Sequence, residues 1–397
     1  MGFRGRNQGG SFVVSRQFIK SDQSVIIFGA GNTGEKFAYK YFNQIKICCF
    51  WDNQKTGEFL GYPVYRPERN SQKIIIVASN AYFEIRAQLI DMGYEEFHDF
   101  IPFQIFRKKM AVAYGNCHMD VIRRYLQHNK EFASEYGFYP FPQIQRMNRL
   151  QFEYDKILQN CDLFFHQSIR KNNRYGAAYS SENMLQYVKE TCNIISVPNL
   201  YGLPKYLFPQ LDMQYDGPVG NIPPFFVDNN IKAWLKMGKS KKEIMSYILF
   251  GGVYSKREII IMWEDFQRKL GKREKEWDIK ISDYIFSNYQ KEKLFNDTNH
   301  ITSKMAKEIA VRILKYMGYQ TPVFLESPSM DALEVFVYHD VKEALGLAFE
   351  EKFIRKYSQD ASLLSGYEMD LEEYIEQLCQ YTIFLEDYEN RVINRGR

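Results

Sequence analysis

Short apolar runs alternate with amphipathic stretches over most of the chain. The runs at 25–28, 45–51 and 73–78 predict buried strands, because they are short and bounded by glycine or polar residues. Between and after them, apolar positions recur with helical spacing over 35–43 and 81–92, and a glycine ends the second stretch. Strand, turn, helix and strand in this order form a βαβ unit, so we expect a parallel sheet with right-handed crossovers.

The same alternation begins again after a short basic link. Strands are predicted at 110–114, 161–165 and 194–197, with a helix at 120–129. A strongly amphipathic helix is predicted over 302–317, where apolar side chains lie four residues apart and a glycine follows the last turn. The chain therefore contains a second α/β unit.

Differences in hydrophobic pattern and charge along the chain predict its domain organisation. Residues 1–20 read as a flexible arm and 21–108 as a Rossmann-like domain of nucleotide-binding type. Residues 109–322 form a second domain with a Lys/Glu-rich helical insertion at about 228–284, and 323–397 a helical, acidic C-terminal extension. The expected fold class is α/β, with two parallel-sheet units, a helical insertion and a helical C-terminal extension.

Charge and composition narrow the class of protein. Among 397 residues, 52 Lys and Arg face 48 Asp and Glu, and this balance argues against a nucleic-acid binder with a concentrated basic stripe. No apolar run approaches the ~20 residues of a membrane span, and the N-terminus lacks the apolar stretch of a signal peptide. Six cysteines without a CxxC pattern fit reduced thiols. We expect a cytoplasmic protein that can still be peripheral to the inner membrane.

A glycine turn follows the first predicted strand. Gly29, Gly31 and Gly34 stand in the order G-x-G-x-x-G before a helix, and Asp52 ends the next strand about 20 residues later. The glycines allow close backbone approach, the helix N-terminus attracts phosphate, and the carboxylate can accept ribose hydroxyls. Two interpretations stay open: a nucleotide site, or a degenerate module that packs against the rest of the chain.

A second strand-to-helix turn carries a thiol. In Gly115-Asn116-Cys117-His118, the helix N-terminus that follows would stabilise the thiolate and supply N–H donors for an oxyanion. A lone cysteine is more often core filler. His118 neighbours the thiol and is a candidate to assist it.

The loop before the 302–317 helix supplies a possible base. Asp297 and His300 are three residues apart in Asp-Thr-Asn-His, so the carboxylate can orient the imidazole, which can then move a proton. This spacing is typical of SGNH-type hydrolases and acyltransferases, with Cys117 where they have serine. The alternative is that His300 caps the helix or faces solvent.

Several other residues are weaker candidates. Gln167, after His166 at the end of a strand, could line the same sheet edge. We expect cations near the site strands to hold phosphates: Arg123, Arg124, Arg170, Lys171 and Arg174. No set of His, Cys and Asp residues has zinc-ligand spacing, so no metal is expected.

Four segments together resemble the WcbI family of polysaccharide biosynthesis proteins, which are regarded as acyltransferases that bind coenzyme A. They are Gly115-Asn116-Cys117-His118, the strand end at 162–167, Val197-Pro198-Asn199 and Asn299-His300. The resemblance covers about 110–318 and implies an SGNH-like catalytic domain with coenzyme A as cofactor.

The region 25–100 separately resembles the Rossmann-like modules attached to sugar-modifying enzymes of surface-polysaccharide clusters. Besides the glycine turn, the resemblance rests on Trp51-Asp52-Asn53, Gly61-Tyr62-Pro63-Val64 and the strand at 75–79. It implies a nucleotide-sugar as a candidate ligand of the first domain.

The leading hypothesis is an acyltransferase of capsule or other surface-polysaccharide biosynthesis, with an acyl-CoA donor and a sugar hydroxyl acceptor. Cys117 would attack the thioester and His300 would move the proton, while N–H groups at 116–118, with Gln167 as a further donor, would hold the oxyanion. Direct activation of the sugar hydroxyl by His300 is the alternative mechanism.

Three other functions stay open. They are a glycan esterase with the same triad, a nucleotide-sugar-binding scaffold whose C-terminal helices dock a partner or a second copy, and a nicotinamide oxidoreductase. Exclusion of water separates transfer from hydrolysis, and the sequence does not report it.

Overall fold

The computed structural model describes residues 24–150, 152–212, 227–320, 322–325, 335–351, 354–355, 368–373, 375–376, 378–380 and 382–383. Within them the chain forms two compact units. The first takes the described residues up to Tyr114 together with Lys130–Ile194, and the second takes Gly115–Asn129 and the described residues from Ile195 onward. The arm predicted at 1–20 lies outside the described residues.

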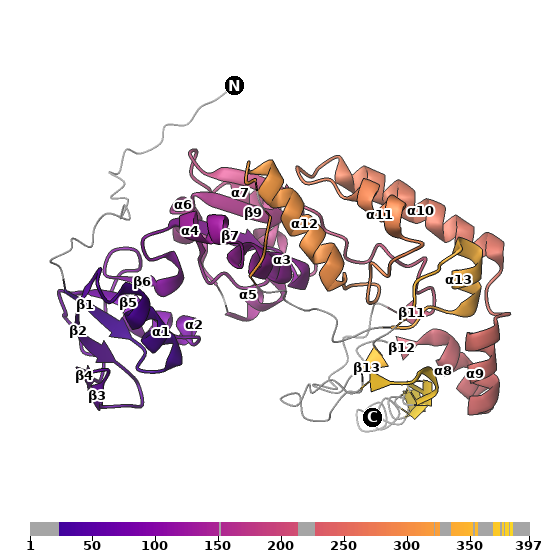
Figure 1. Cartoon of the computed structure of the whole chain (residues 1–397), viewed down its shortest axis with the longest axis horizontal. Helices are drawn as coiled ribbons and strands as arrows, with labels where there is room; N and C mark the ends of the chain where they lie inside the picture. Colours follow the sequence, from indigo (N-terminus) through magenta and orange to yellow (C-terminus); the bar gives the residue numbers. More distant parts are fainter. Residues whose placement is uncertain are drawn as a thin grey trace. The chain divides into compact units, whose positions relative to one another are not determined.

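The first unit begins with a six-stranded sheet in the order β3-β4-β2-β1-β5-β6 (Figure 1). At its centre β1 (Ser24–Phe28) pairs in parallel with β2 (Lys46–Trp51) and with β5 (Ile74–Val77). Helices α1 (Asn32–Tyr41) and α2 (Tyr82–Asp91) follow β1 and β5 in the chain. This arrangement confirms the α/β class predicted from the sequence.

The outer strands of this sheet were not anticipated. β3 (Gly57–Phe59) and β4 (Tyr62–Tyr65) form an antiparallel hairpin, of which β4 pairs in parallel with β2. At the other edge β6 (Phe100–Pro102) runs parallel to β5. All three strands are short, and most residues of β3 and β4 are half-exposed or exposed. They therefore lack the apolar runs that identify β1, β2 and β5.

The centre of the sheet is buried on both faces. Alternate residues of β1 enter opposite cores, with Val25 and Ile27 in one cluster and Ile26 and Phe28 in the other. All four side chains are at most 2% exposed. A strand that is apolar at every position is what a parallel sheet covered on both faces requires.

The first unit also holds most of a second sheet, in the order β10-β9-β7-β8, and from Ile195 the edge strand β10 is assigned to the second unit. β7 (Lys109–Tyr114) pairs in parallel with β8 (Tyr136–Phe138) and β9 (Leu163–Gln167), and β10 (Asn193–Val197) lies at the edge. One apolar cluster contains residues of both sheets. A carboxylate within it, that of Glu96, accepts hydrogen bonds from the hydroxyls of Tyr82 and Tyr139 and pairs with Arg86, so this buried charge has partners for both oxygens.

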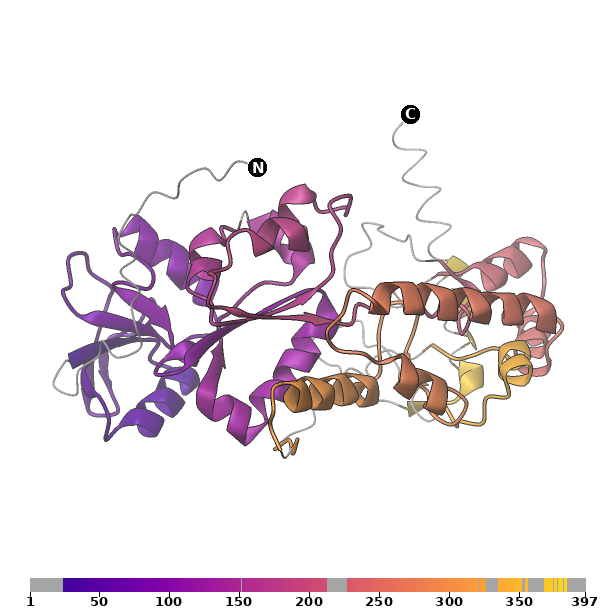
Figure 2. The same ribbon diagram turned by 90° about the horizontal axis from the view of Figure 1, so that it is seen from above.

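Helices dominate the second unit. α3 (Cys117–Gln127) packs on α12 (Ser303–Tyr316). The predicted helical insertion contains α8 (Asn229–Lys236), α9 (Lys241–Phe250), the long unbroken α10 (Lys256–Glu274; Figure 2) and α11 (Ser282–Asn288). Serines cap α9 and α10, each with a glutamate three residues later that bonds back to the cap.

The described part of the C-terminal region contains α13 (His339–Leu345) and a two-stranded sheet of β13 (Ile354–Arg355) and β14 (Glu368–Met369). Among the described helices, none combines the length and apolar character needed to cross a membrane.

Candidate functional site

The turn between β7 and α3 is organised by an asparagine. Asn116 has an extended backbone and its side-chain oxygen accepts a hydrogen bond from the His118 N–H at 3.0 Å, which caps the helix. α3 therefore begins at Cys117, three residues earlier than the sequence pattern predicts. The Cys117 side chain is half-buried and lies in the first turn of α3.

The site loop, residues 294–302, connects α11 to α12. Phe295 and Ile301 form an antiparallel bridge across it, and the Asn296 N–H donates to the His300 carbonyl at 2.9 Å. Thr302 caps α12 by accepting from the Met305 N–H. The loop is thus closed on itself, and both of its ends are tied to regular structure.

Asp297 determines the conformation at the tip of the site loop. Its side chain is fully buried, and its Oδ1 accepts hydrogen bonds from the backbone N–H groups of Asn299 (2.6 Å) and His300 (2.9 Å). Its Oδ2 lies 2.7 Å from Nδ1 of the His300 ring. One carboxylate therefore fixes both the backbone and the side chain of His300, and it fixes the ring tautomer as well.

His300 is hydrogen-bonded on both sides. Because Nδ1 is taken by Asp297, Nε2 is the nitrogen left for the hydrogen bond with the Cys117 side chain. Burial disfavours the charged ring, but hydrogen bonds and opposite charge from Asp297 and Cys117 outweigh burial and raise the pKa of His300 to about 10. At neutral pH the arrangement is an imidazolium held between a carboxylate and a sulfur.

His118, next to the thiol, has a different environment. Its ring is 1% exposed, and its Nε2–H donates to the backbone carbonyl of Asn299 in the site loop. Nδ1 is buried without a hydrogen-bond partner. Burial, followed by repulsion from the positive charge of His300, lowers the pKa of His118 to about 3, against the opposing effect of the Asn299 hydrogen bond. His118 is therefore neutral.

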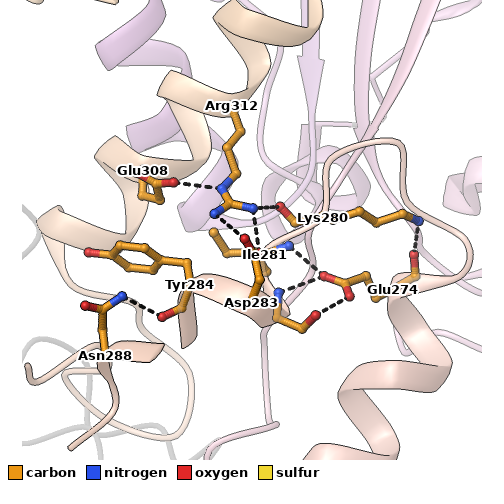
Figure 3. A network of polar contacts seen from close by, with 9 residues as sticks. Glu274, Lys280, Ile281, Asp283, Tyr284, Asn288, Glu308 and Arg312 are labelled. Atoms are coloured by element: carbon orange, nitrogen blue, oxygen red, sulfur yellow. Dashed lines mark hydrogen bonds and ion pairs between the residues drawn. The ribbon is translucent and has the colours of Figure 1, made fainter. Parts of the chain in front are cut away.

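Charged side chains join the helices on either side of the site loop (Figure 3). Arg312 of α12 binds both carboxylate oxygens of Asp283 in α11, at 2.6 and 2.9 Å, and Glu308 at 2.7 Å. Glu274, at the end of α10, accepts hydrogen bonds from Ile281 and from the first N–H group of α11. These contacts fix the directions in which the chain enters and leaves the site loop.

A buried ion cluster supports the site loop from the C-terminal region. Glu351 pairs with Lys293, directly before the loop, at 2.9 Å and with Lys342 at 2.6 Å. The Lys293 ammonium also donates to the Val335 carbonyl, and the Val335 N–H donates to the carbonyl of Asn296 at 2.8 Å. A segment beyond the predicted catalytic domain thus contacts the loop that carries His300.

The other predicted site residues are distributed over both units. Arg123 lies on α3 in the second unit, where it pairs with Asp120 at 2.6 Å and donates to Gln127. Gln167 ends β9 in the first unit, where it is fully buried and its carbonyl accepts from the Ser181 hydroxyl. Arg170 and Arg174 are exposed in the loop after β9, and the Arg174 guanidinium lies over the Tyr175 ring.

The glycine turn of the first unit is closed by its own chain. Asp52 Oδ2 accepts from the Ala30 N–H at 3.0 Å, and Oδ1 accepts from the N–H groups of Gln54 and Lys55. The Lys55 ammonium donates to the Ala30 carbonyl. A side chain at Gly34 would meet the carbonyl oxygen of Gly29, the reason that this position requires glycine. Asp52 thus accepts three backbone N–H groups, and a nucleotide at this turn stays a prediction.

Some contributions to the site could not be recognised in the sequence. The expectation that N–H groups at 116–118 jointly hold an oxyanion needs correction, because the His118 N–H is used by the cap of α3. Asn299 acts through its carbonyl, which every residue type has. Arg312 and Asp283 are ordinary exposed-helix residues by pattern. Within the described residues, no cluster of three His, Cys, Asp or Glu side chains could hold a metal ion.

Two family models match the chain. That of the polysaccharide biosynthesis enzyme WcbI matches residues 110–322, which is more than half of the chain. That of the N-terminal domain of C2185-like proteins matches residues 21–98.

A solved structure of WcbI, described as a novel polysaccharide biosynthesis enzyme, has a similar fold. The TM-score is 0.55 at 20% sequence identity, over 69% of this chain and 90% of that one. That structure is described as the native protein without a disulfide bond between coenzyme A and one of its cysteines. No curated protein sequence is significantly similar to this chain.

Proposed function

The chain belongs to the family of the polysaccharide biosynthesis enzyme WcbI, and from this premise we propose that it transfers an acyl group from coenzyme A to a sugar hydroxyl. Acetyl is the simplest such group. The observation that carries the proposal is the continuous chain of hydrogen bonds from Cys117 through His300 to the buried Asp297.

In the first step the Cys117 thiolate attacks the thioester carbonyl of acyl-CoA. The tetrahedral oxyanion collapses, the carbon–sulfur bond to coenzyme A breaks, and the leaving thiolate takes the proton from the His300 imidazolium. The products are an acyl-cysteine and free coenzyme A. A thiolate already paired with an imidazolium needs no separate base for this attack.

The second step needs a neutral His300. Acylation removes the negative charge of the sulfur, one of the groups that raise the pKa of His300, so the ring releases its proton more readily. Neutral His300 then accepts the proton of the sugar hydroxyl as its oxygen attacks the acyl-cysteine. When the carbon–sulfur bond breaks, the thiolate and the imidazolium are restored. The same pair thus serves both half-reactions.

Coenzyme A as the donor is supported by the description of the similar WcbI structure, which mentions coenzyme A in stating that it has no disulfide bond to a cysteine of that protein. Arg123 on α3, the helix that begins with Cys117, is the cation proposed for its phosphates. The Cys117 N–H, at the first position of α3, is the proposed oxyanion donor.

The experiment is intact-protein mass spectrometry after mixing with acetyl-CoA in the absence of sugar. We expect the mass of one acetyl group on Cys117, absent from the Cys117→Ala variant and retained in Cys48→Ala, a control at another half-buried thiol. Sugar acetylation that persists in Cys117→Ala but not in His300→Ala would replace the acyl-enzyme by direct transfer. Release of acetate that is unaffected by added sugars would instead favour an esterase.

A further inference from the structure

The two histidines of the site are linked through one peptide unit. His118 donates its Nε2–H to the carbonyl of Asn299, and the next residue along the chain is His300. The two residues joined by this bond are 181 positions apart in sequence. It therefore ties the first turn of α3, which carries Cys117, to the tip of the site loop.

The chemistry of His118 argues against a role in moving protons. A ring whose Nε2–H is donated to a peptide carbonyl must keep that proton to keep the bond. The remaining nitrogen, Nδ1, is buried without a partner and exposes less than 1 Å² to solvent. Its pKa, lowered to about 3 chiefly by burial, agrees with a ring that stays neutral. The Nε2–H of His118 is held by a carbonyl and its Nδ1 is buried, so neither ring nitrogen is placed to exchange a proton with solvent.

The position of His118 suits a different task. The ring centroids of His118 and His300 are 6.3 Å apart and nearly perpendicular. A neutral ring at that distance does not repel the His300 imidazolium, whereas a cation there would. The residue also leaves a buried acceptor unpaired, which costs stability and is uncommon in a purely structural contact.

We propose that His118 is a positioning residue that clamps the Asn299 carbonyl to the start of α3 and thereby holds the His300 ring at the Cys117 sulfur. Asp297 orients the His300 ring within the loop, and His118 sets where the loop stands relative to the thiol. The kinetic consequence rests on the proposed acyl transfer, but the geometric one does not.

The test compares His118→Leu, which removes the donor, with His118→Gln, whose amide N–H can still reach a carbonyl. The first readout is the rate at which iodoacetamide labels Cys117 at pH 7, because only the thiolate reacts. We expect labelling to slow about tenfold in His118→Leu and to stay within about threefold of the wild type in His118→Gln. His98→Leu, at an exposed histidine of the first unit, serves as the control and should leave the rate unchanged.

The second readout is steady-state acyl transfer. We expect kcat to fall by about 100-fold in His118→Leu with little change in the KM for acyl-CoA, since displacement of a reacting group affects the transition state more than substrate binding. His118→Gln should recover most of this loss. Circular dichroism and thermal melting confirm that each variant is folded.

Three outcomes would overturn the proposal. One is a folded His118→Leu protein with unchanged labelling of Cys117. Another is a folded His118→Gln protein in which labelling of Cys117 slows about tenfold or more, and this result decides alone if the leucine variant does not fold. The third is a shift of the kcat pH profile in His118→Gln that matches the loss of a titrating acid or base. Failure of the wild type to transfer acyl groups would contradict the proposed function. The labelling of Cys117 would still decide whether His118 positions the site loop.

Discussion

Two glycine-containing turns in the chain lead from a strand into a helix, and their polar groups have different partners. In the turn at 29–34, the Ala30 N–H and carbonyl are bonded by Asp52 and Lys55 of the same chain. In the turn at 115–118, a half-buried thiol stands at the helix start, hydrogen-bonded to a histidine from a distant loop. In the first turn Asp52 and Lys55 bond the Ala30 peptide groups while α1 has no side-chain cap. In the second, a half-buried thiol stands at a helix start that Asn116 caps.

The two turns differ in which of their polar groups have hydrogen-bond partners. Asp52 accepts three backbone N–H groups. Around the second turn, three buried polar atoms have no hydrogen-bond partner: Nδ1 of His118, Oγ1 of Thr298 and Oδ1 of Asn299. Each such atom costs about 1–3 kcal/mol of stability. Unpaired buried polar atoms are retained where they serve a function that outweighs the lost stability. We interpret those of the site loop in this way.

The largest effect is expected from removing Asp297. Asp297→Ala deletes the acceptor of two backbone N–H groups and of the His300 ring, so both the loop tip and the tautomer are lost. Acyl transfer should fall by about 10⁴-fold, the scale seen when the orienting carboxylate of a triad is removed. Product formation measured under saturating acyl-CoA checks this. Glu264→Ala, which removes an exposed carboxylate of α10, is the control, and an equal loss in that variant would mean that orientation of His300 does not explain the effect.

A second prediction concerns the charge of His300. Its pKa should be near 10 in the wild type and should fall in Cys117→Ala, because one of the two groups that offset burial is removed. Since the folded-state pKa is raised, the stability it contributes is complete below about pH 6.5 and is lost as the pH rises through about 10. Titration of the ring by NMR, assigned with His300→Gln, measures the shift. A His300 pKa that is the same with and without the thiol would mean that the two side chains are not paired.

The smallest effect is expected at the first turn. Burial would raise the pKa of Asp52, but its three backbone hydrogen bonds outweigh burial and hold the pKa below its usual value. Asp52→Asn should therefore lower the free energy of unfolding by about 1–2 kcal/mol at pH 7. The difference should shrink as the pH falls through the folded-state pKa, and acyl transfer should be unchanged.

Urea unfolding with Glu58→Gln, an exposed carboxylate of the same sheet, provides the matched control for Asp52→Asn. A UDP-sugar that stabilises the wild type but not Asp52→Asn would show that the turn binds a ligand after all. That result would remove the contrast between the two turns.

The sequence predicts those parts of the molecule in which neighbours along the chain determine the outcome. The apolar runs of β1, β2 and β5 identified the central strands, and Asp297 and His300, three residues apart, were recognised as partners. The hairpin of β3 and β4 was missed because its residues are mostly exposed and carry no period-two pattern. The start of α3 was placed too late, because the cap depends on the side-chain rotamer of Asn116.

Long-range contacts are the part that the sequence could not provide. Nothing in the sequence around His118 indicates that its ring is bonded to a carbonyl far along the chain. Nor does the sequence show that the ring is neutral, since burial determines its charge. Arg312 and Asp283 likewise read as solvated helix residues. These roles follow from tertiary packing, which residue spacing alone does not encode.

The contact between Val335 and the site loop bears on where a functional fragment can end. The region that matches the family model stops at 322, yet the Val335 N–H donates to the carbonyl of Asn296, and Glu351 pairs with Lys293 directly before the same loop. A fragment cut at 322 would keep Cys117 and His300 but would leave a buried lysine without its counter-ion. The region that matches the family model is therefore shorter than the region that contains the contacts of the site loop. A fragment cloned for crystallisation or display should extend beyond residue 351.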